Sequence, residues 1–287
     1  MPRFSVAALL CACMLGSCGR SQKPIVVGSK DETEQMILGE IVAQHLEHRL
    51  GRAIERRSGL GGTPVLYQAL ISGEVGVYPE YTGLIESEIL KEPASADPQI
   101  LLTRVRSQMD MAQLELLDPL GFDNPPAIVV SAKGTEKLAT LSDAARQEKP
   151  WKPGFTSDFQ SRLDGLSALA PYRLPFDPPL VTQARRLFPA LEKGDVNMIA
   201  ARATDAHLMT PDWKILADDR KVFPAYQACL LVRKDLLAAD PRLRPALAEL
   251  SGKFQADTMR KLNAEVDREH RPPAAVAADF LAQAGLR

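Results

Sequence analysis

The chain alternates short apolar segments with amphipathic stretches of helical period, and this alternation restricts its fold more than any other feature. Lys23 to Gly28 predicts a strand, and Glu34 to Leu50 places apolar side chains near one face of a helix. The pattern continues as a strand over 53–58, a helix over 64–73 and a strand over 75–78. Such an order is typical of an α/β fold with a largely parallel sheet, in which ligands gather at the carboxyl ends of the strands.

The same alternation restarts in the middle of the chain. Pro125 to Val130 predicts a strand entered through two prolines, which would stiffen a hinge. Further elements are a helix around 141–147, a strand or turn at 154–156, a helix at 183–193, strands at 195–201, 213–217 and 225–232, and a helical tail at 241–287. The simplest arrangement is two α/β lobes joined by two crossing strands, with a cleft between them. We expect residues 25–122 and 227–287 in one lobe and residues 123–226 in the other.

The first residues resemble an export signal. Arg3 precedes the uncharged run FSVAALLCACMLGS, which is too short to span a bilayer as a permanent helix. The run ends in Leu15-Gly16-Ser17-Cys18, which resembles a bacterial lipobox. We therefore expect residues 1–17 to be removed, Cys18 to carry the lipid and residues 18–24 to form a tether to a membrane. A plainly cleaved signal is the alternative.

Cysteine usage and charge narrow the possible partners. If the signal is removed and Cys18 is lipidated, Cys229 stands alone and no intramolecular disulfide can form. The formal net charge is −1 and no basic stripe is present, which argues against nucleic acid as a partner. After the signal, no apolar run is long enough for a transmembrane helix. The sequence therefore predicts a soluble body that reaches the membrane only through its lipid anchor.

The segment SKDETE, residues 29–34, precedes the first long helix. Ser29 and Glu32 have the spacing of a capping box, and the acids of the first turn would complement the helix dipole. Lys30 does not fit this explanation, because a cation beside a helix N-terminus is unfavourable unless an anion meets it. A carboxylate ligand would provide that anion.

Five segments carry a resemblance to one family: GSKDETEQMILGEIVAQHLE, LGGTPVLYQALISGEVGVYPEYTG, LLDPLGFDNP, ATDAHLMTPDWKILADD and MRKLNAEVD. Together they resemble the glycine betaine, carnitine and choline binding proteins of osmoprotectant ABC importers. The resemblance runs from about Ile25 to Leu281 and implies a type II periplasmic binding fold that closes on a small solute. It also implies a monomer without catalytic activity or cofactor, which hands a zwitterionic or cationic solute to a permease and its ATPase partner.

The resemblance also assigns ligand contacts. Aromatic faces hold a trimethylammonium group by cation–π attraction, while lysine, arginine and backbone groups meet a carboxylate. Lys30 stands at the family's ligand-contacting lysine, Tyr81 at a tyrosine of its aromatic cage, and Arg162 at the arginine of the second lobe. Gln35 is expected to support these contacts or to bind backbone.

Other positions depart from the family pattern. Asn124 is followed by Pro126, where the family commonly has a tyrosine, so one face of the cage is missing. Phe188 replaces a tyrosine but keeps the ring, and Trp213 would supply a further ring in a shifted register. Arg202 adds a cation where the family often has an aromatic or small residue.

Because of these departures, the sequence does not identify which solute is bound. Betaine, choline and carnitine are candidates, and so is another zwitterionic solute such as an amino acid derivative or a thiol betaine. A hydrolase or transferase would need a nucleophile with a base, and the sequence has neither a GxSxG elbow nor a paired cysteine and histidine. A ligand sensor would need the same closing cleft, and neighbouring permease and ATPase genes would favour import.

Several polar residues are expected to be structural. Tyr78 is expected to face the core or the neighbouring lobe, and Asp205 with His207 to act as surface or cap groups. His45 and His48 are spaced i, i+3 without a third ligand, which predicts a solvated helix face rather than a metal site. Cys229 is expected to be a small apolar residue of the core.

Overall fold

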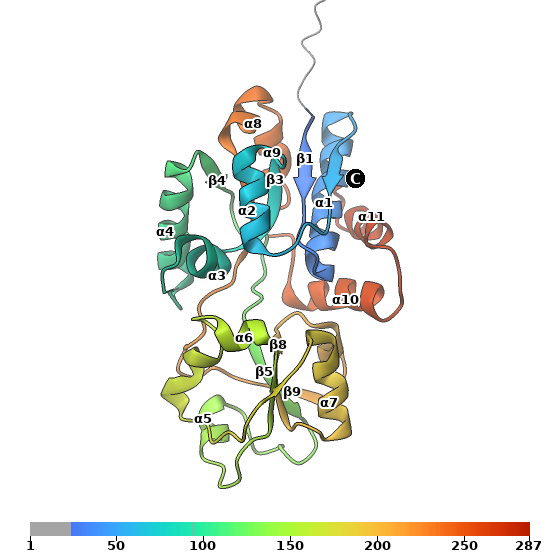
Figure 1. Cartoon of the computed structure of the whole chain (residues 1–287). Helices are drawn as coiled ribbons and strands as arrows, with labels where there is room; N and C mark the ends of the chain where they lie inside the picture. The colour runs from blue at the N-terminus through green and yellow to red at the C-terminus, as the bar shows by residue number, and fades with distance from the viewer. Residues whose placement is uncertain (1–23, 94) are drawn as a thin grey trace, which may run out of the picture.

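The structure, a computed structural model, describes residues 24–93 and 95–287, and its ribbon divides into two lobes (Figure 1). Each lobe contains one five-stranded mixed sheet. Apolar side chains pack against both faces of each sheet. The predicted α/β fold with two lobes is therefore confirmed, whereas the predicted signal and the lipidated Cys18 lie outside the described residues.

Lobe 1 is built on the sheet β2-β1-β3-β10-β4, in which β10 runs antiparallel to both of its neighbours. The strands are β1 (Val26–Gly28), β2 (Glu55–Arg57), β3 (Val77–Tyr81), β4 (Leu114–Leu116) and β10 (Ala228–Arg233). Successive residues of β10 point to opposite faces, with Leu230 in one apolar cluster and Leu231 in the other. The central strand is thus buried on both sides, as its unbroken apolar sequence predicts.

The helices of lobe 1 fall into two groups. One face is covered by α1 (Thr33–Leu50), α8 (Lys234–Ala239), α9 (Leu243–Ala248), α10 (Ala256–Asp267) and α11 (Pro273–Gln283). The other is covered by α2 (Thr63–Ser72), the π-helix Ile85–Leu90 and α4 (Pro98–Met111), whereas Leu84 of the short α3 (Thr82–Leu84) belongs to the apolar cluster of the first face. The helical tail that the sequence predicts is confirmed, and it returns to pack against α1.

Lobe 2 is built on the sheet β7-β6-β8-β5-β9. Its strands are β5 (Pro126–Ser131), β6 (Pro153–Phe155), β7 (Leu180–Val181), β8 (Met198–Arg202) and β9 (Trp213–Leu216). Its helices are α5 (Leu141–Ala145), α6 (Ser157–Ser161) and α7 (Leu187–Lys193), with 3-10 turns at Leu166–Tyr172, Ala184–Arg186 and Ala206–Met209 (η4). The short helices leave the ends of β5 and β8 close to lobe 1.

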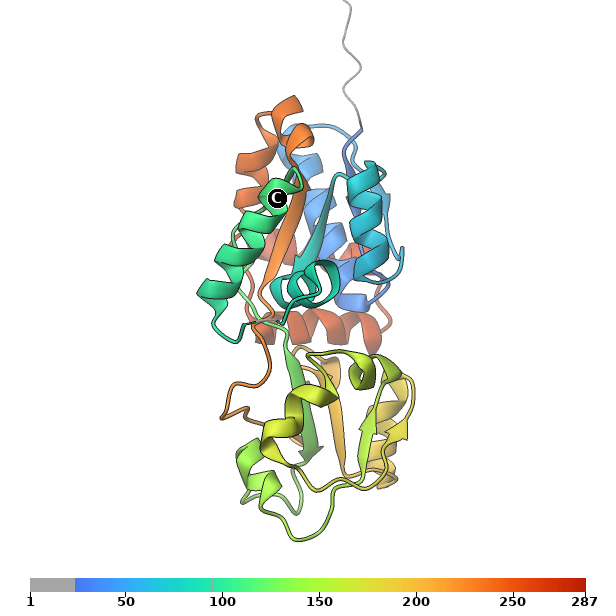
Figure 2. The same ribbon diagram turned by 60° about the vertical axis from the view of Figure 1, so that its left-hand side comes forward.

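The chain crosses between the lobes twice, and the two crossings meet in a single antiparallel bridge between Asp123 and Gln227 (Figures 1 and 2). Helix α10 lies along the boundary and contacts η4 of lobe 2. Across it, Asn263 Nδ2 donates to Thr204 O at 2.9 Å and Arg260 Nε donates to Ala203 O at 2.8 Å. The lobes are therefore held together in this arrangement by hydrogen bonds as well as by the covalent crossings.

Three local predictions need correction. The capping box at Ser29 and Glu32 is wrong, because the N-cap of α1 is Glu32 without a side-chain cap bond, and Ser29 Oγ accepts from Gly59 N instead. Strand β3 runs on to Tyr81, since the antiparallel partner β10 pairs with it through that residue. His45 is wholly buried and not on a solvated face, because its ring nitrogens lie 3.0 Å from Leu286 O and 2.9 Å from Ala246 O.

The other structural assignments agree with the sequence. Tyr78 and Cys229 are buried in the lobe 1 core, and Asp205 is the N-cap of η4, where it accepts from His207 N. Over the described residues, no helix combines the length and the apolar character needed to cross a membrane.

Candidate functional site between the lobes

The edge of lobe 1 that faces lobe 2 holds a buried ion pair. Lys30 follows β1 and Glu80 lies near the end of β3, and the carboxyl ends of neighbouring parallel strands meet at one edge. Lys30 Nζ lies 2.7 Å from Glu80 Oε1 and 3.2 Å from Thr63 Oγ1, and the two charged side chains are 1% and 0% exposed. The anion that meets Lys30 here is therefore Glu80. Lys30 Nζ also lies 5.0 Å from the centre of the Tyr81 ring, within cation–π distance.

Glu34, in the first turn of α1, joins lobe 1 to the first crossing. It accepts hydrogen bonds from the Tyr81 hydroxyl, from Asn124 Nδ2 at 2.9 Å and from Asn263 Nδ2 at 3.0 Å. Asn124 Oδ1 in turn accepts from Thr204 N of lobe 2 at 3.1 Å. Burial raises the pKa of Glu34, and the surrounding donors offset only part of that shift. Glu34 belongs to the family segment that begins GSKDETEQ, but the sequence predicted for it only the role of a first-turn acid that complements the helix dipole.

The raised pKa of Glu34 predicts a pH dependence. The folded protein favours the protonated form of Glu34. The resulting contribution to the free energy of unfolding is complete below the ordinary pKa of 4.5 and is lost as pH rises through the higher pKa of the folded state. We expect the unfolding free energy of the wild type, relative to Glu34→Gln, to fall as pH rises above the ordinary pKa of 4.5. Urea unfolding at a series of pH values measures this difference, with the exposed Glu74→Gln as control. A difference that is flat or that rises with pH would contradict the assignment.

Tyr226, in the second crossing, is enclosed by two guanidinium groups of lobe 2. The centre of its ring lies 5.9 Å from Arg162 Cζ and 5.1 Å from Arg202 Cζ. Arg162 is held by Asp164 through two hydrogen bonds of 2.8 and 2.7 Å, and the Tyr226 hydroxyl donates to the same carboxylate. Sequence reasoning missed Tyr226, although it lies inside the predicted strand 225–232, and Asp164, which stands two residues after Arg162.

Glu88 extends this group of charges back to lobe 1. It lies in the π-helix that follows the YPEYTG segment, and its Oε1 is 3.8 Å from Arg162 Nη1 across the boundary. Burial raises the pKa of Glu88, while the positive charges of Arg162 and Lys30 oppose the shift. Acidic and basic side chains from both lobes therefore face one another at this boundary. We call the set Lys30, Glu34, Gln35, Glu80, Tyr81, Glu88, Asn124, Arg162, Asp164, Arg202 and Tyr226 the interlobe junction.

Some polar atoms of the interlobe junction have no partner among the described residues. Gln35 is wholly buried, and neither of its side-chain amide atoms makes a hydrogen bond. Arg202 Nη1 is likewise buried without an acceptor. Buried polar groups are almost always paired in folded proteins, so unpartnered ones at a boundary between lobes indicate a place for a polar ligand.

The two remaining predicted residues lie together in lobe 2, beside His207 of η4. Phe188 stacks on His207 with ring centres 4.3 Å apart, and Trp213 meets Phe188 edge-on at 5.8 Å. Phe188 is only 3% exposed and belongs to the core cluster beneath α7. The structure thus brings Lys30, Tyr81, Gln35 and Asn124 to one side of the interlobe junction and Arg162 with Arg202 to the other. It places Phe188 and Trp213 against each other in the lobe 2 core.

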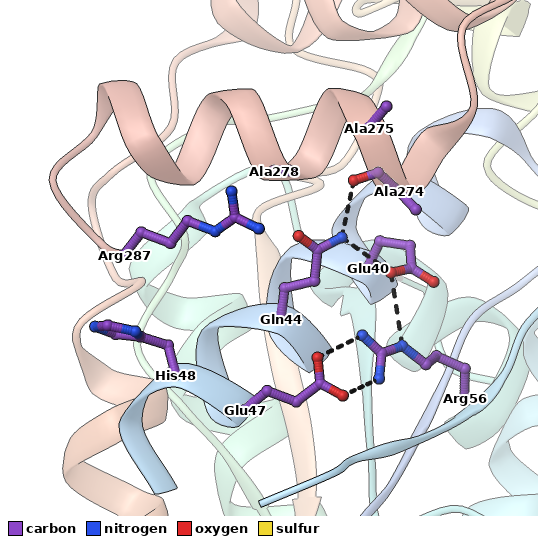
Figure 3. A pocket seen from close by; sticks show the side chains of 9 residues that line it. All are labelled: Glu40, Gln44, Glu47, His48, Arg56, Ala274, Ala275, Ala278 and Arg287. Atoms are coloured by element: carbon purple, nitrogen blue, oxygen red, sulfur yellow. Dashed lines mark hydrogen bonds and ion pairs between the residues drawn. The ribbon is translucent and has the colours of Figure 1, made fainter. Parts of the chain in front are cut away.

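A surface pocket of about 700 Å³ lies away from this boundary, between α1, β2 and α11 (Figure 3). Arg56 pairs there with Glu47 and Glu40, and Gln44 donates to Ala274 O at 2.8 Å. These contacts fasten α1 to β2 and α11. Within the ranges that the structure describes, no cluster of three potential metal ligands is present.

Comparison with known proteins gives the family. Residues 23–283 match the model of the substrate binding domain of the ABC-type glycine betaine transport system. The carnitine transport binding protein OpuCC of Listeria monocytogenes is 30% identical over 97% of this chain and 94% of its own length. An ergothioneine transport permease and binding protein of Helicobacter pylori is 33% identical over 92% of this chain, which spans about half (48%) of that longer protein.

A solved structure described as a glycine betaine/carnitine/choline ABC transporter protein superposes with a TM-score of 0.83 at 26% identity, over 91% of this chain and 99% of the other. These relatives are transport binding proteins and not enzymes. The predicted type II periplasmic binding fold is confirmed by this superposition. The chain belongs to the family of substrate-binding domains of ABC-type glycine betaine transport systems.

Proposed function

We propose that this chain is the extracytoplasmic solute-binding protein of an ABC importer, which captures a quaternary ammonium solute such as glycine betaine, choline or carnitine and delivers it to the permease. One observation carries the proposal. At the interlobe junction Glu88 of lobe 1 lies 3.8 Å from Arg162 of lobe 2, the Tyr226 ring lies beside Arg162 and Arg202, and the Tyr81 ring lies beside Lys30. Charges of both signs beside aromatic faces fit a solute that carries a cationic and an anionic end.

The remaining parts of the proposal rest on the sequence and the family. Lipidation of Cys18 would tether the mature protein to a membrane on its outer side, and the permease would work with an ATPase subunit. We expect the protein to act as a monomer, because one chain supplies both lobes and both crossings.

A second solute class is favoured by one comparison. The Helicobacter pylori relative is named for ergothioneine, a thiol betaine, and it is 33% identical to this chain. The missing cage tyrosine at Pro126 also reduces the number of rings that the family pattern would supply. Ergothioneine therefore belongs among the solutes to be tested.

Isothermal titration calorimetry tests the proposal. We expect the purified protein to bind at least one of glycine betaine, carnitine, choline and ergothioneine with a Kd of about 10⁻⁴ M or lower, which corresponds to roughly 5.5 kcal/mol. Lysine and sucrose serve as control solutes that lack a quaternary ammonium group. If none of the four solutes binds at millimolar concentration, the proposed function fails while the fold assignment stands.

A further inference from the structure

Three basic side chains of the interlobe junction were expected to meet an anionic ligand, and two of them already have carboxylate partners. Lys30 is paired with Glu80 at 2.7 Å. Arg162 is held by both oxygens of Asp164. A ligand carboxylate would have to compete with these built-in anions, so neither group is a good receptor for it.

Arg202 is different. It ends β8, opposite Pro126 at the start of β5, and so it lies where lobe 2 meets the first crossing. Among the described residues no carboxylate lies within ion-pair distance of its guanidinium group, and Nη1 is buried without an acceptor. The guanidinium group lies over the face of the Tyr226 ring, with Cζ 5.1 Å from the ring centre.

The contact with Tyr226 fixes the guanidinium without neutralising it. Stacking on an aromatic face orients the planar guanidinium group and leaves its N–H groups free to donate hydrogen bonds in the plane of the group. Arg202 is only partly buried, but its Nη1 is shielded from water without an acceptor, which costs free energy until an anion arrives, and a planar guanidinium suits a carboxylate through two parallel hydrogen bonds. The guanidinium group of Arg202 is therefore oriented to bind a planar anion such as a carboxylate.

We propose that Arg202 is the specificity-determining residue that receives the carboxylate of the solute. This inference rests on the proposed function, because it concerns the ligand of the same junction. Glu88 lies on the lobe 1 side of the boundary, 3.8 Å from Arg162 Nη1, and is the anion offered to the cationic end, whereas the Tyr81 ring already has Lys30 Nζ at 5.0 Å. The protein then selects solutes that carry a carboxylate over amides or alcohols of the same shape.

The test compares matched solutes on matched variants. The solutes are glycine betaine and carnitine, each with its primary amide, which keeps the shape and loses the negative charge. The variants are wild type, Arg202→Gln, Arg202→Lys and, as a control on an exposed arginine, Arg146→Ala, whose side chain is 69% exposed. Calorimetry gives the ratio of the two Kd values, amide over acid, for each variant.

We expect Arg202→Gln to weaken binding of the acid by roughly ten- to a hundredfold while the Kd of the amide changes by less than about threefold. Arg202→Lys should bind the acid more tightly than Arg202→Gln but less tightly than the wild type, because lysine keeps the positive charge and lacks the two parallel donors of guanidinium. Arg146→Ala should leave the ratio unchanged. Should Arg202→Gln fail to fold, as seen by circular dichroism, the ratio in Arg202→Lys decides, and a value equal to that of the wild type overturns the inference.

The outcomes separate this inference from the proposed function. If the wild type binds none of glycine betaine, carnitine, choline and ergothioneine, the proposed function has failed, whereas binding of choline without either acid leaves the function standing and overturns the role of Arg202. If the wild type binds the acid and Arg202→Gln leaves the ratio unchanged, or weakens acid and amide alike, the function stands and the role of Arg202 is overturned. A wild type that binds acid and amide equally well also overturns it.

Discussion

Replacing Lys30 by alanine is expected to lower the free energy of unfolding by about 3–5 kcal/mol, the usual cost of removing one partner of a buried ion pair. Lys30 and Glu80 are 1% and 0% exposed, so the carboxylate left behind could not be solvated. The loss should be visible by urea denaturation as a lower midpoint, together with weaker solute binding, because the pair fixes the edge beside Tyr81.

Two comparisons make this prediction specific. Lys137→Ala removes an exposed lysine and should change the unfolding free energy by no more than about 0.5 kcal/mol. The double variant Lys30→Met with Glu80→Gln removes both charges and should recover part of the loss, because no unpaired ion remains. An unfolding free energy of Lys30→Ala equal to that of the wild type would show that Lys30 is not held as the structure describes.

Replacing Asp164 by alanine is expected to cost about 2–4 kcal/mol, because it strips Arg162 of a bidentate partner and leaves the Tyr226 hydroxyl without its acceptor. The cost is smaller than for Lys30, since Arg162 keeps Asp158 at 3.3 Å and Glu88 at 3.8 Å. Urea denaturation again provides the measurement.

The same arginine supplies the control for Asp164. Asp158 also pairs with Arg162, but its side chain is 66% exposed, and Asp158→Ala should cost less than about 1 kcal/mol. Equal effects of the two aspartate variants would contradict the view that Asp164 is the partner that neutralises Arg162. Arg162 would then be a second candidate receptor for the solute's anionic end.

Much of this fold could be predicted from the sequence, because the periodicity of apolar residues and the positions of glycine and proline can be read from short segments. Helix α1 and strands β1, β5 and β8 follow directly from the apolar pattern and from the glycines and prolines that bound it. Helix α4 was missed, although Asp97 caps it and its buried face is formed by Leu101, Leu102, Val105 and Met109. The burial of His45 could not be predicted, because it depends on two carbonyl groups from the distant C-terminal segments.

The site was predictable in part, for a related reason. Family motifs placed Lys30 and Tyr81 at one edge, where β1 and β3 end side by side. Motifs do not reveal which distant residue neutralises a given charge, so Glu80 and Asp164 were missed as partners. The rings at Phe188 and Trp213 were expected at the ligand, but the structure packs them against each other, and their role there stays a prediction.

The order of strands in lobe 1 bears on how the chain reaches its native state. Strand β10 sits between β3 and β4, although more than a hundred residues, including the whole lobe 2 sheet, separate it from β4 in sequence. Lobe 2 is built from one continuous stretch, so it has all its strands before β10 has been synthesised. Until β10 arrives, β3 and β4 have unpaired edges that invite aggregation and chaperone binding. Lobe 1 should therefore be the slower half to assemble, because its closure requires contacts between distant parts of the polypeptide.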